Sequence, residues 1–269
     1  MKKICFVGGG NMAGAMLAGL RREHPALNCH VIEPFAPARE KLAGMNVVVH
    51  EAACRAAVAD ADAVVLAVKP QMLKQACAEL QPHLNGELIV SIAAGTRSAS
   101  IARWLAGHAR IVRTMPNTPA LIGQGITGLF APPSLAEVDV ATATELMRST
   151  GAVVRVESEA MIDAVTAVSG SGPAYVFQWI ESMLAAAKGV GFNDADARTL
   201  VLATLKGATA LAEASDESPA VLRERVTSKG GTTAAALAVI DERGVQQALI
   251  DAVRAARDRG AELGAMADG

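Results

Sequence analysis

The sequence predicts an α/β protein, with an N-terminal Rossmann doubly wound sheet and a C-terminal all-helical domain. Three observations support this prediction. Short apolar runs alternate with helical segments up to residue 158, a glycine-rich turn follows the first run, and strand candidates nearly vanish afterwards. Alternation at this spacing is typical of βαβ units in a parallel sheet. We therefore expect a dinucleotide-binding domain over residues 1–158 and a helical domain over residues 159–269.

The elements of the first domain follow from apolar runs and helical periodicity. Residues 3–7 (KICFV) form a short apolar run, typical of a strand buried on both faces. Further strands are predicted at residues 28–32, 47–49, 63–68, 88–92, 110–115, 128–130 and 153–156. Helices are predicted at residues 11–20, 39–43, 52–59, 71–80, 99–105 and 134–149.

The second domain consists of long Ala-rich segments with helical periodicity. Helices are predicted at residues 175–190, 194–214, 219–227, 232–242 and 246–266. Aromatic residues make up only 3% of the chain, so its small side chains let helices approach closely. Because long apolar helices of this kind often associate, we expect a homo-oligomer.

Composition excludes several classes of function. The formal net charge is -2, which gives no basic field for nucleic acid. No run approaches the ~20 apolar residues that a membrane helix needs. The four cysteines, Cys5, Cys29, Cys54 and Cys77, form no CxxC pair, and the five histidines show no metal-ligand spacing. We expect a cytoplasmic protein with reduced thiols that binds no metal, membrane or nucleic acid.

The glycine-rich turn GGGNMA, residues 8–13, matches the pattern G-x-G-x-x-G/A between a strand and a helix. In this pattern Gly8 permits a tight turn and Gly10 lets the backbone approach a pyrophosphate. Ala13 lets helix and strand pack closely, and Asn11 and Met12 open a helix whose N–H groups face the phosphates. The motif predicts dinucleotide binding; the alternative is a structural turn.

Glu33 ends the second predicted strand, 25 positions after Gly8. An acidic residue there commonly holds the adenosine ribose hydroxyls, which favours NAD over NADP. The alternative is a solvated glutamate beside Pro34. Arg39 could still meet the 2′-phosphate of NADP, so the residues alone leave the choice of cofactor open.

Two further segments follow strands and therefore lie where α/β sheets bind ligands. Val68, Lys69 and Pro70 end the most hydrophobic strand and are expected near the ribose and nicotinamide. Asn117 lies in MPNTP, where two prolines fix the loop and leave one polar amide. The alternatives are a surface lysine before a helix-starting proline, and a rigid turn without function.

Two segments of the second half are candidates for a substrate site. Residues 169–175, SGSGPAY, are expected to form a flexible loop running into a helix. Residues 227–233, TSKGGTT, precede another predicted helix. Serine and threonine at a helix start are ordinary N-caps. A glycine pair there also exposes several N–H groups together, which suits a carboxylate.

Over essentially its whole length the chain resembles the pyrroline-5-carboxylate reductase family. The resemblance rests on GGGNMA at 8–13, AVKP at 67–70, SIAAG at 91–95, MPNTP at 115–119, SGSGPAY at 169–175 and VTSKGGTTAAAL at 226–237. The last two motifs are the most specific. The family usually has proline where this chain has Lys229, which puts the rigidity of that loop in doubt.

The resemblance implies reduction of the cyclic imine 1-pyrroline-5-carboxylate to L-proline, the last step of proline synthesis. It implies NADP (NADPH) as the cofactor, with NAD (NADH) as an alternative, and a homodimer through the helical domain. Ala93, in SIAAG, would border the cofactor. Thr233 would be the catalytic hydroxyl near the imine nitrogen. The residues implied at the substrate are Ser171, Gly172, Pro173, Ser228, Gly230, Gly231, Thr232 and Thr233.

Two other functions compete with this interpretation. A hydroxyacid dehydrogenase would need a base for the hydroxyl proton, which those enzymes supply from a lysine soon after their glycine-rich loop. Here no lysine follows Ser171 until Lys188. A silent dinucleotide-binding sensor would keep the GGGNMA turn but has no reason to keep SGSGPAY or SKGGTT.

Overall fold

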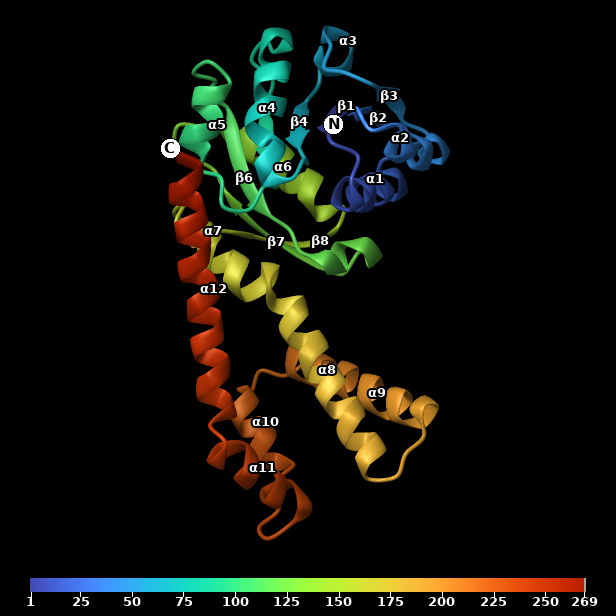
Figure 1. The fold of residues 1–269 in the computed structure, drawn as a ribbon, viewed down its shortest axis with the longest axis vertical. Coiled ribbons are helices and arrows are strands. Elements are labelled where there is room, and N and C mark those ends of the chain that lie inside the picture. The colour runs from blue at the N-terminus through green and yellow to red at the C-terminus, as the bar shows by residue number, and fades with distance from the viewer. Residues whose placement is uncertain (269) are drawn as a thin grey trace. The chain divides into compact units, whose positions relative to one another are not determined.

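A computed structural model of the chain describes residues 1–268 (Figure 1). By their contacts these residues form two compact units. The sheet unit comprises Met1–Pro173 and the segment from Ala255 onward, and the helical unit comprises Ala174–Arg254. The contact boundary thus lies later than residue 158, because residues 159–173 pack on the sheet: an added Cβ at Gly128 would lie 2.5 Å from Val165.

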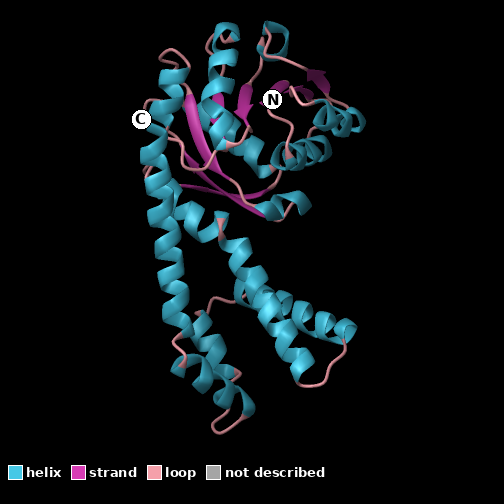
Figure 2. Cartoon of the chain, viewed as in Figure 1, coloured by secondary structure: helices cyan, strands magenta, loops and turns pink. Residues whose placement is uncertain are grey.

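The sheet unit contains one sheet of eight strands, drawn as magenta arrows in Figure 2. Their order is β3-β2-β1-β4-β5-β6-β7-β8. The strands from β3 to β6 in this order are parallel; β7 is antiparallel to β6, and β8 is parallel to β7. Their bounds are β1 Lys3–Val7, β2 Asn28–Ile32, β3 Val48–His50, β4 Ala63–Leu66, β5 Ile89–Ser91, β6 Ile111–Met115, β7 Gly125–Phe130 and β8 Gly151–Arg155. The predicted fold class is confirmed.

Helices cover both faces of this sheet, which explains its continuous apolar strands. In β1, Ile4 and Phe6 join the core beneath α1 and α6, whereas Cys5 and Val7 join the core beneath α3, α4 and α5. The helix bounds are α1 Asn11–Glu23, α2 Ala36–Leu42, α3 Arg55–Val58, α4 Pro70–Leu80, α5 Ser98–Trp104, α6 Glu137–Arg148 and α7 Met161–Val165. Short 3₁₀ turns are η1 Ala43–Met45, η2 Gln81–His83 and η3 Thr118–Ile122.

The helical unit leaves much of its apolar surface uncovered. Its helices are α8 Gly172–Gly189, α9 Asp194–Glu213, α10 Pro219–Arg225 and α11 Thr232–Glu242, and α12 Val245–Asp268 begins in it. Phe177, Trp179 and Leu211 are about half exposed. Within α8 to α11 only Ala197 and Val201 are buried. Such a surface is typical of a protein–protein interface. None of the described helices is long and apolar enough to cross a membrane.

The segment SGSGPAY is not the flexible loop that its composition predicts. Residues Thr166–Gly170 form a π turn (η4) between α7 and α8. The Ser171 N–H donates to the Thr166 carbonyl at 2.7 Å, and the Ser169 hydroxyl donates to the Val165 carbonyl at 3.0 Å. Gly170 lies close to Met115, since an added Cβ would be 2.7 Å from the Met115 Cε. Serine and glycine serve close packing here rather than mobility.

Candidate active site

The predicted cofactor residues come together at one edge of the sheet. The strands β1, β2, β4, β5 and β6 are parallel, so their carboxyl ends share that edge. Chain order runs outward in opposite directions from β1 and β4, which makes their junction a topological switch point. Ligands of open α/β sheets bind outside the carboxyl ends at such a point.

The glycine turn after β1 requires glycine at its first position and is crowded at its second. Gly8 has φ +99, and an added Cβ would lie 2.9 Å from the Ala67 carbonyl oxygen. At Gly9 an added Cβ would lie 2.6 Å from the Leu42 side chain. The chain just after β4 therefore excludes a side chain at Gly8, and a side chain at Gly9 would have to displace Leu42 at the end of α2.

The third glycine faces open space and begins helix α1. An added Cβ at Gly10 would meet nothing within 4 Å. Gly10 is the N-cap of α1, no side chain caps the helix, and its first turn holds no acidic residue. Ala13 is fully buried, so the helix packs tightly on the sheet. Uncapped N–H groups beside open space fit the pyrophosphate of a dinucleotide.

Glu33 is engaged with the backbone around the glycine turn. Its Oε2 accepts a hydrogen bond from the Gly9 N–H at 2.8 Å, and its Oε1 accepts one from the Phe35 N–H at 2.9 Å. The residue is only 9% exposed. Glu33 thus connects the turn after β1 with the chain that leaves β2. The alternative of a solvated glutamate is therefore wrong, because the side chain is buried and hydrogen-bonded.

The segments after β4 and β5 line the same edge. Val68 touches the glycine turn, since its Cγ1 would lie 2.9 Å from a Cβ at Gly8. Lys69 is exposed and is the N-cap of α4, with Pro70 as the first helical residue. Ala93 is buried, and its N–H donates to the Ser91 hydroxyl at 3.3 Å. Only Lys69 offers a free cationic side chain among these positions.

The substrate candidates in the helical unit gather at the start of α11. Gly230 has φ +73, and the Gly231 N–H donates to the Ser228 carbonyl at 3.0 Å. An added Cβ at Gly231 would lie 2.4 Å from the Ser228 hydroxyl oxygen, so a side chain there would require Ser228 to move. No side chain caps α11, which leaves the first-turn N–H groups of Thr232 and Thr233 available. The remaining candidates, Ser171, Gly172 and Pro173, lie at the start of α8.

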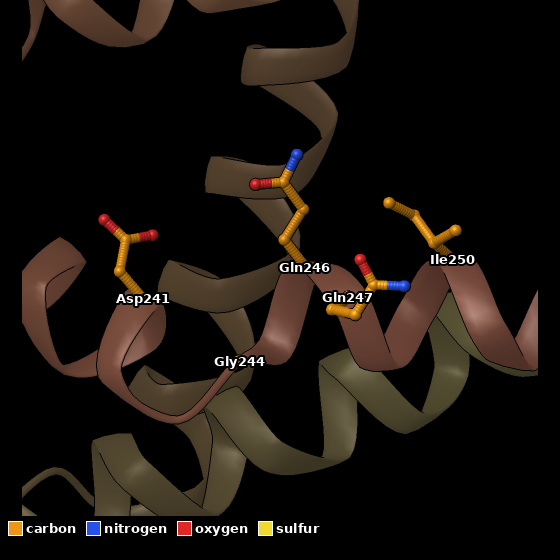
Figure 3. A pocket seen from close by; sticks show the side chains of 5 residues that line it. All are labelled: Asp241, Gly244, Gln246, Gln247 and Ile250. Carbon is orange, nitrogen blue, oxygen red and sulfur yellow. The ribbon is translucent and has the colours of Figure 1, made fainter.

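Two surface hollows of the helical unit lie outside the predicted sites. One is lined by Asp241, Gly244, Gln246, Gln247 and Ile250 at the junction of α11 and α12, and Figure 3 shows these residues. The other is lined by Arg223, Glu224, Thr227, Leu237 and Asp241. Neither includes a predicted site residue.

An ion pair between Arg113 of β6 and Glu159 was not predicted from the sequence. The Arg113 Nη1 lies 3.0 Å from the Glu159 Oε1, and the Arg113 side chain is only 3% exposed. The same Glu159 oxygen accepts a hydrogen bond from the Ser98 N–H at 2.6 Å. Glu159 thereby fixes the start of α5, just after the SIAAG segment. A charged residue in the apolar strand IVRTM is the only signal that could have revealed the pair.

Two of the four cysteines are made unreactive by burial. All four are free thiols. Burial raises the pKa of both Cys5 and Cys77 to about 12, so these two side chains remain protonated near neutral pH. Within the described residues, no group of three or more His, Cys, Asp or Glu side chains could hold a metal ion.

Comparison with known proteins identifies both parts of the chain. Residues 3–95 match the family of F420-dependent NADP oxidoreductases, and residues 159–263 match the pyrroline-5-carboxylate reductase dimerisation family. The pyrroline-5-carboxylate reductase of Pseudomonas aeruginosa is 44% identical, over 97% of this chain and 96% of the relative. That of Haemophilus influenzae is 40% identical, over 97% of each chain.

Solved structures agree with the sequence comparisons. A pyrroline-5-carboxylate reductase from Coxiella burnetii superposes with a TM-score of 0.89 at 37% identity, covering 97% of each chain. A pyrroline carboxylate reductase from Plasmodium falciparum, solved with NADP bound, gives 0.85 at 26% identity and covers 98% of each chain.

Proposed function

The chain belongs to the pyrroline-5-carboxylate reductase family, and from this membership we propose how its residues reduce 1-pyrroline-5-carboxylate. The enzyme is an NAD(P)H-dependent oxidoreductase that transfers hydride to the C=N bond of the cyclic imine and so forms L-proline. The relatives in Pseudomonas aeruginosa and Haemophilus influenzae support this activity. The nicotinamide, when bound, supplies the hydride, and the protein supplies binding and orientation.

The dinucleotide would be held at the carboxyl edge of the sheet. Its pyrophosphate fits the uncapped start of α1 at Asn11, Met12 and Ala13, beside the open face of Gly10. The chain after β4, β5 and β6 would border the nicotinamide half through Val68, Lys69, Pro70, Ala93 and Asn117. NADP is the favoured cofactor, because the matched family and the Plasmodium falciparum structure are both described with NADP.

The substrate carboxylate would be held by the start of α11. The turn of Ser228, Gly230 and Gly231 exposes the first N–H groups of this helix, and the helix dipole favours an anion there. The hydroxyl of Thr233 is proposed to donate a hydrogen bond to the imine nitrogen. Thr232 would contact the substrate on the same turn, and Ser171, Gly172 and Pro173 are proposed as further substrate-binding residues.

Catalysis would depend mainly on positioning. The residues proposed at the substrate are hydroxyls, glycines and a proline, so no strong acid or base lies among them. An iminium protonated in solution, or through the Thr233 hydroxyl, accepts hydride without such a group. Orientation of the ring carbon against the hydride donor then accounts for most of the rate gain.

The enzyme is a homo-oligomer, and we propose a homodimer formed through the helical unit. The exposed Phe177, Trp179 and Leu211 support this interface, as does the dimerisation family that residues 159–263 match. A cytoplasmic location is proposed because all four cysteines are free thiols.

The observation that carries the proposed cofactor site is the uncapped start of α1 beside open space at Gly10. The test follows the oxidation of NADPH and NADH with pyrroline-5-carboxylate, with piperidine-type imines and 3-hydroxy acids as controls. Strong oxidation with pyrroline-5-carboxylate is the expected result. Cofactor binding without any oxidation would overturn the reductase and favour a sensor, and oxidation only with hydroxy acids would favour a dehydrogenase.

A further inference from the structure

The side chain of Arg39 lies at the edge of the cofactor site, where β2 and β3 end. Its Nη1 donates to the Glu33 carbonyl at 3.1 Å and to the Pro34 carbonyl at 2.6 Å. These two bonds fix the guanidinium beside the chain that leaves β2. The side chain is 23% exposed, so a charged face remains accessible to solvent.

The other end of this guanidinium is paired with Glu51. The Arg39 Nη2 donates to the Glu51 Oε1, immediately after β3. The Glu51 side chain is 77% exposed. Arg39 is thus anchored by backbone on one side and neutralised on the other by a carboxylate that can move into solvent. An exposed ion pair of this kind is weak and easily exchanged.

Glu33 and Arg39 have different roles at the end of β2. Both Glu33 carboxylate oxygens accept backbone N–H groups, and the residue is buried. Its side chain is therefore engaged with the glycine turn and the chain after β2. Arg39, in contrast, can exchange its partner Glu51 for another anion. In this fold the adenosine end of a dinucleotide lies beyond the end of β2, close to Arg39.

On the basis of the proposed function, we infer that Arg39 binds the 2′-phosphate of NADP and that Glu51 competes with that phosphate. The phosphate carries about -1.5 to -2 charges and three acceptor oxygens, so it can replace one exposed carboxylate at Nη2. Arginine binds phosphate and carboxylate through the same planar donors. Glu51 therefore lowers the affinity for NADP and leaves the affinity for NAD unchanged. The pair sets the ratio between the two cofactors.

The test measures binding of two fragments, adenosine 2′,5′-bisphosphate and adenosine 5′-monophosphate, to the full chain by calorimetry. Glu51→Gln should raise affinity for the bisphosphate about 2- to 5-fold, the equivalent of one exposed ion pair, and leave the monophosphate unchanged. Arg39→Gln should lower bisphosphate affinity about 10- to 100-fold, as for loss of a charged hydrogen bond. Arg39 also holds the chain at the end of β2, so Arg39→Gln can fail to fold. In that case the Glu51→Gln variant alone still tests the inference.

Glu23→Gln is the matched control. Glu23 is paired with Arg22 on the surface at 3.6 Å, at the far end of α1 from the glycine turn. That end lies roughly 18 Å along the helix axis, beyond the screening length at physiological salt. Equal changes in Glu51→Gln and Glu23→Gln, or equal changes for both fragments, would overturn the inference. If the fragments respond as expected but pyrroline-5-carboxylate is not reduced, the inference stands and the proposed function fails.

Discussion

The Asn117 side chain is hydrogen-bonded to the backbone of Ser169, a residue 52 positions later. Its Nδ2 donates to the Ser169 carbonyl at 3.1 Å, and its Oδ1 accepts from the Ile126 N–H at 2.9 Å. The residue is 9% exposed. Asn117 thus connects the chain after β6 with the π turn that leads to the proposed substrate residues. Its contact with the cofactor stays a prediction.

Removal of this connection should loosen the π turn. Asn117→Ala leaves the Ile126 N–H and the Ser169 carbonyl without a partner, so we expect a loss of about 1–3 kcal/mol in the free energy of unfolding. Urea unfolding measures this loss. We also expect KM for pyrroline-5-carboxylate to rise more than KM for NADPH. Gln124→Ala, an exposed amide of the same chain segment, is the control, and equal losses in both variants would contradict the role of Asn117.

Two glycines of the cofactor turn should respond differently to alanine. Gly8→Ala forces a side chain onto φ +99 and against the Ala67 carbonyl, so it should destabilise the fold by about 1–3 kcal/mol. Gly10→Ala meets no protein atom and should keep its melting temperature. Its methyl group would occupy the space proposed for the pyrophosphate, so NADPH affinity should fall at least about 10-fold, or about 1.4 kcal/mol. Full NADPH affinity in Gly10→Ala would exclude this placement.

The Thr233 hydroxyl can be tested by two substitutions. Thr233→Ala should lower turnover roughly 10- to 100-fold, at or below the usual contribution of a general acid. Thr233→Ser keeps the hydroxyl and should retain most of the turnover. Steady-state kinetics with saturating NADPH measures both. Wild-type turnover in Thr233→Ala would refute the proposed donor, and equal loss in both variants would indicate a packing role for the methyl group.

Glu159 should contribute strongly to stability through Arg113. Glu159→Ala leaves the Arg113 guanidinium buried without its carboxylate, and the Arg113 Nη2 already has no hydrogen-bond partner. We expect a loss of about 3 kcal/mol in urea unfolding. Glu159→Gln keeps an acceptor for the Ser98 N–H and should lose less. Glu157→Ala, at an exposed neighbouring position, should change stability by less than about 0.5 kcal/mol.

The stability of the sheet unit should depend on pH through His30. Its Nδ1 lies 2.9 Å from the His50 Nε2, and the two rings stack with centroids 5.1 Å apart. Burial, with the nearby Lys3 and His50, lowers the pKa of His30 to about 4. A histidine in the unfolded chain titrates near 6.5. Between these values the unfolded chain binds a proton that the folded chain excludes, so stability should fall as pH decreases through this window.

Unfolding free energies measured across this range should therefore show a shallower pH dependence in His30→Gln than in the parent chain. The variant removes the imidazole whose protonation opposes folding. Comparing slopes rather than absolute stabilities removes any loss of packing caused by the substitution. Parallel slopes in the two proteins would contradict the assignment.

Most of the fold follows from local sequence because most strands are short apolar runs, and several of them are followed closely by glycine or proline. KICFV ends at Gly8, and the strand at 63–66 is followed by Pro70 after a short connection. β7 was found only in part, since GIT at its start mixes glycine with a polar residue. The π turn was missed because serine and glycine favour loops when they are not packed against a neighbour such as Met115.

The local geometry of the candidate site was predictable where one short motif determines it. The glycine turn is such a case, because φ at Gly8 and the start of α1 are fixed within a few residues. The partners of Asn117 and of Glu159 lie tens of residues away, and tertiary packing alone brings them together. The pairing of Arg39 with Glu51 likewise depends on the register of β2 and β3, which no local pattern reveals.

The π turn between α7 and α8 contains one residue more than a regular α-helical turn would. Its bond from the Ser171 N–H to the Thr166 carbonyl encloses one residue more than an α-helical bond would. Loss of a single residue here, such as the buried Ala167, would restore regular winding. Within the sheet unit, the side chains of Ser171 and Pro173 would then rotate by about 100° relative to α7. The direction in which these residues at the start of α8 point is therefore encoded by an insertion of one residue.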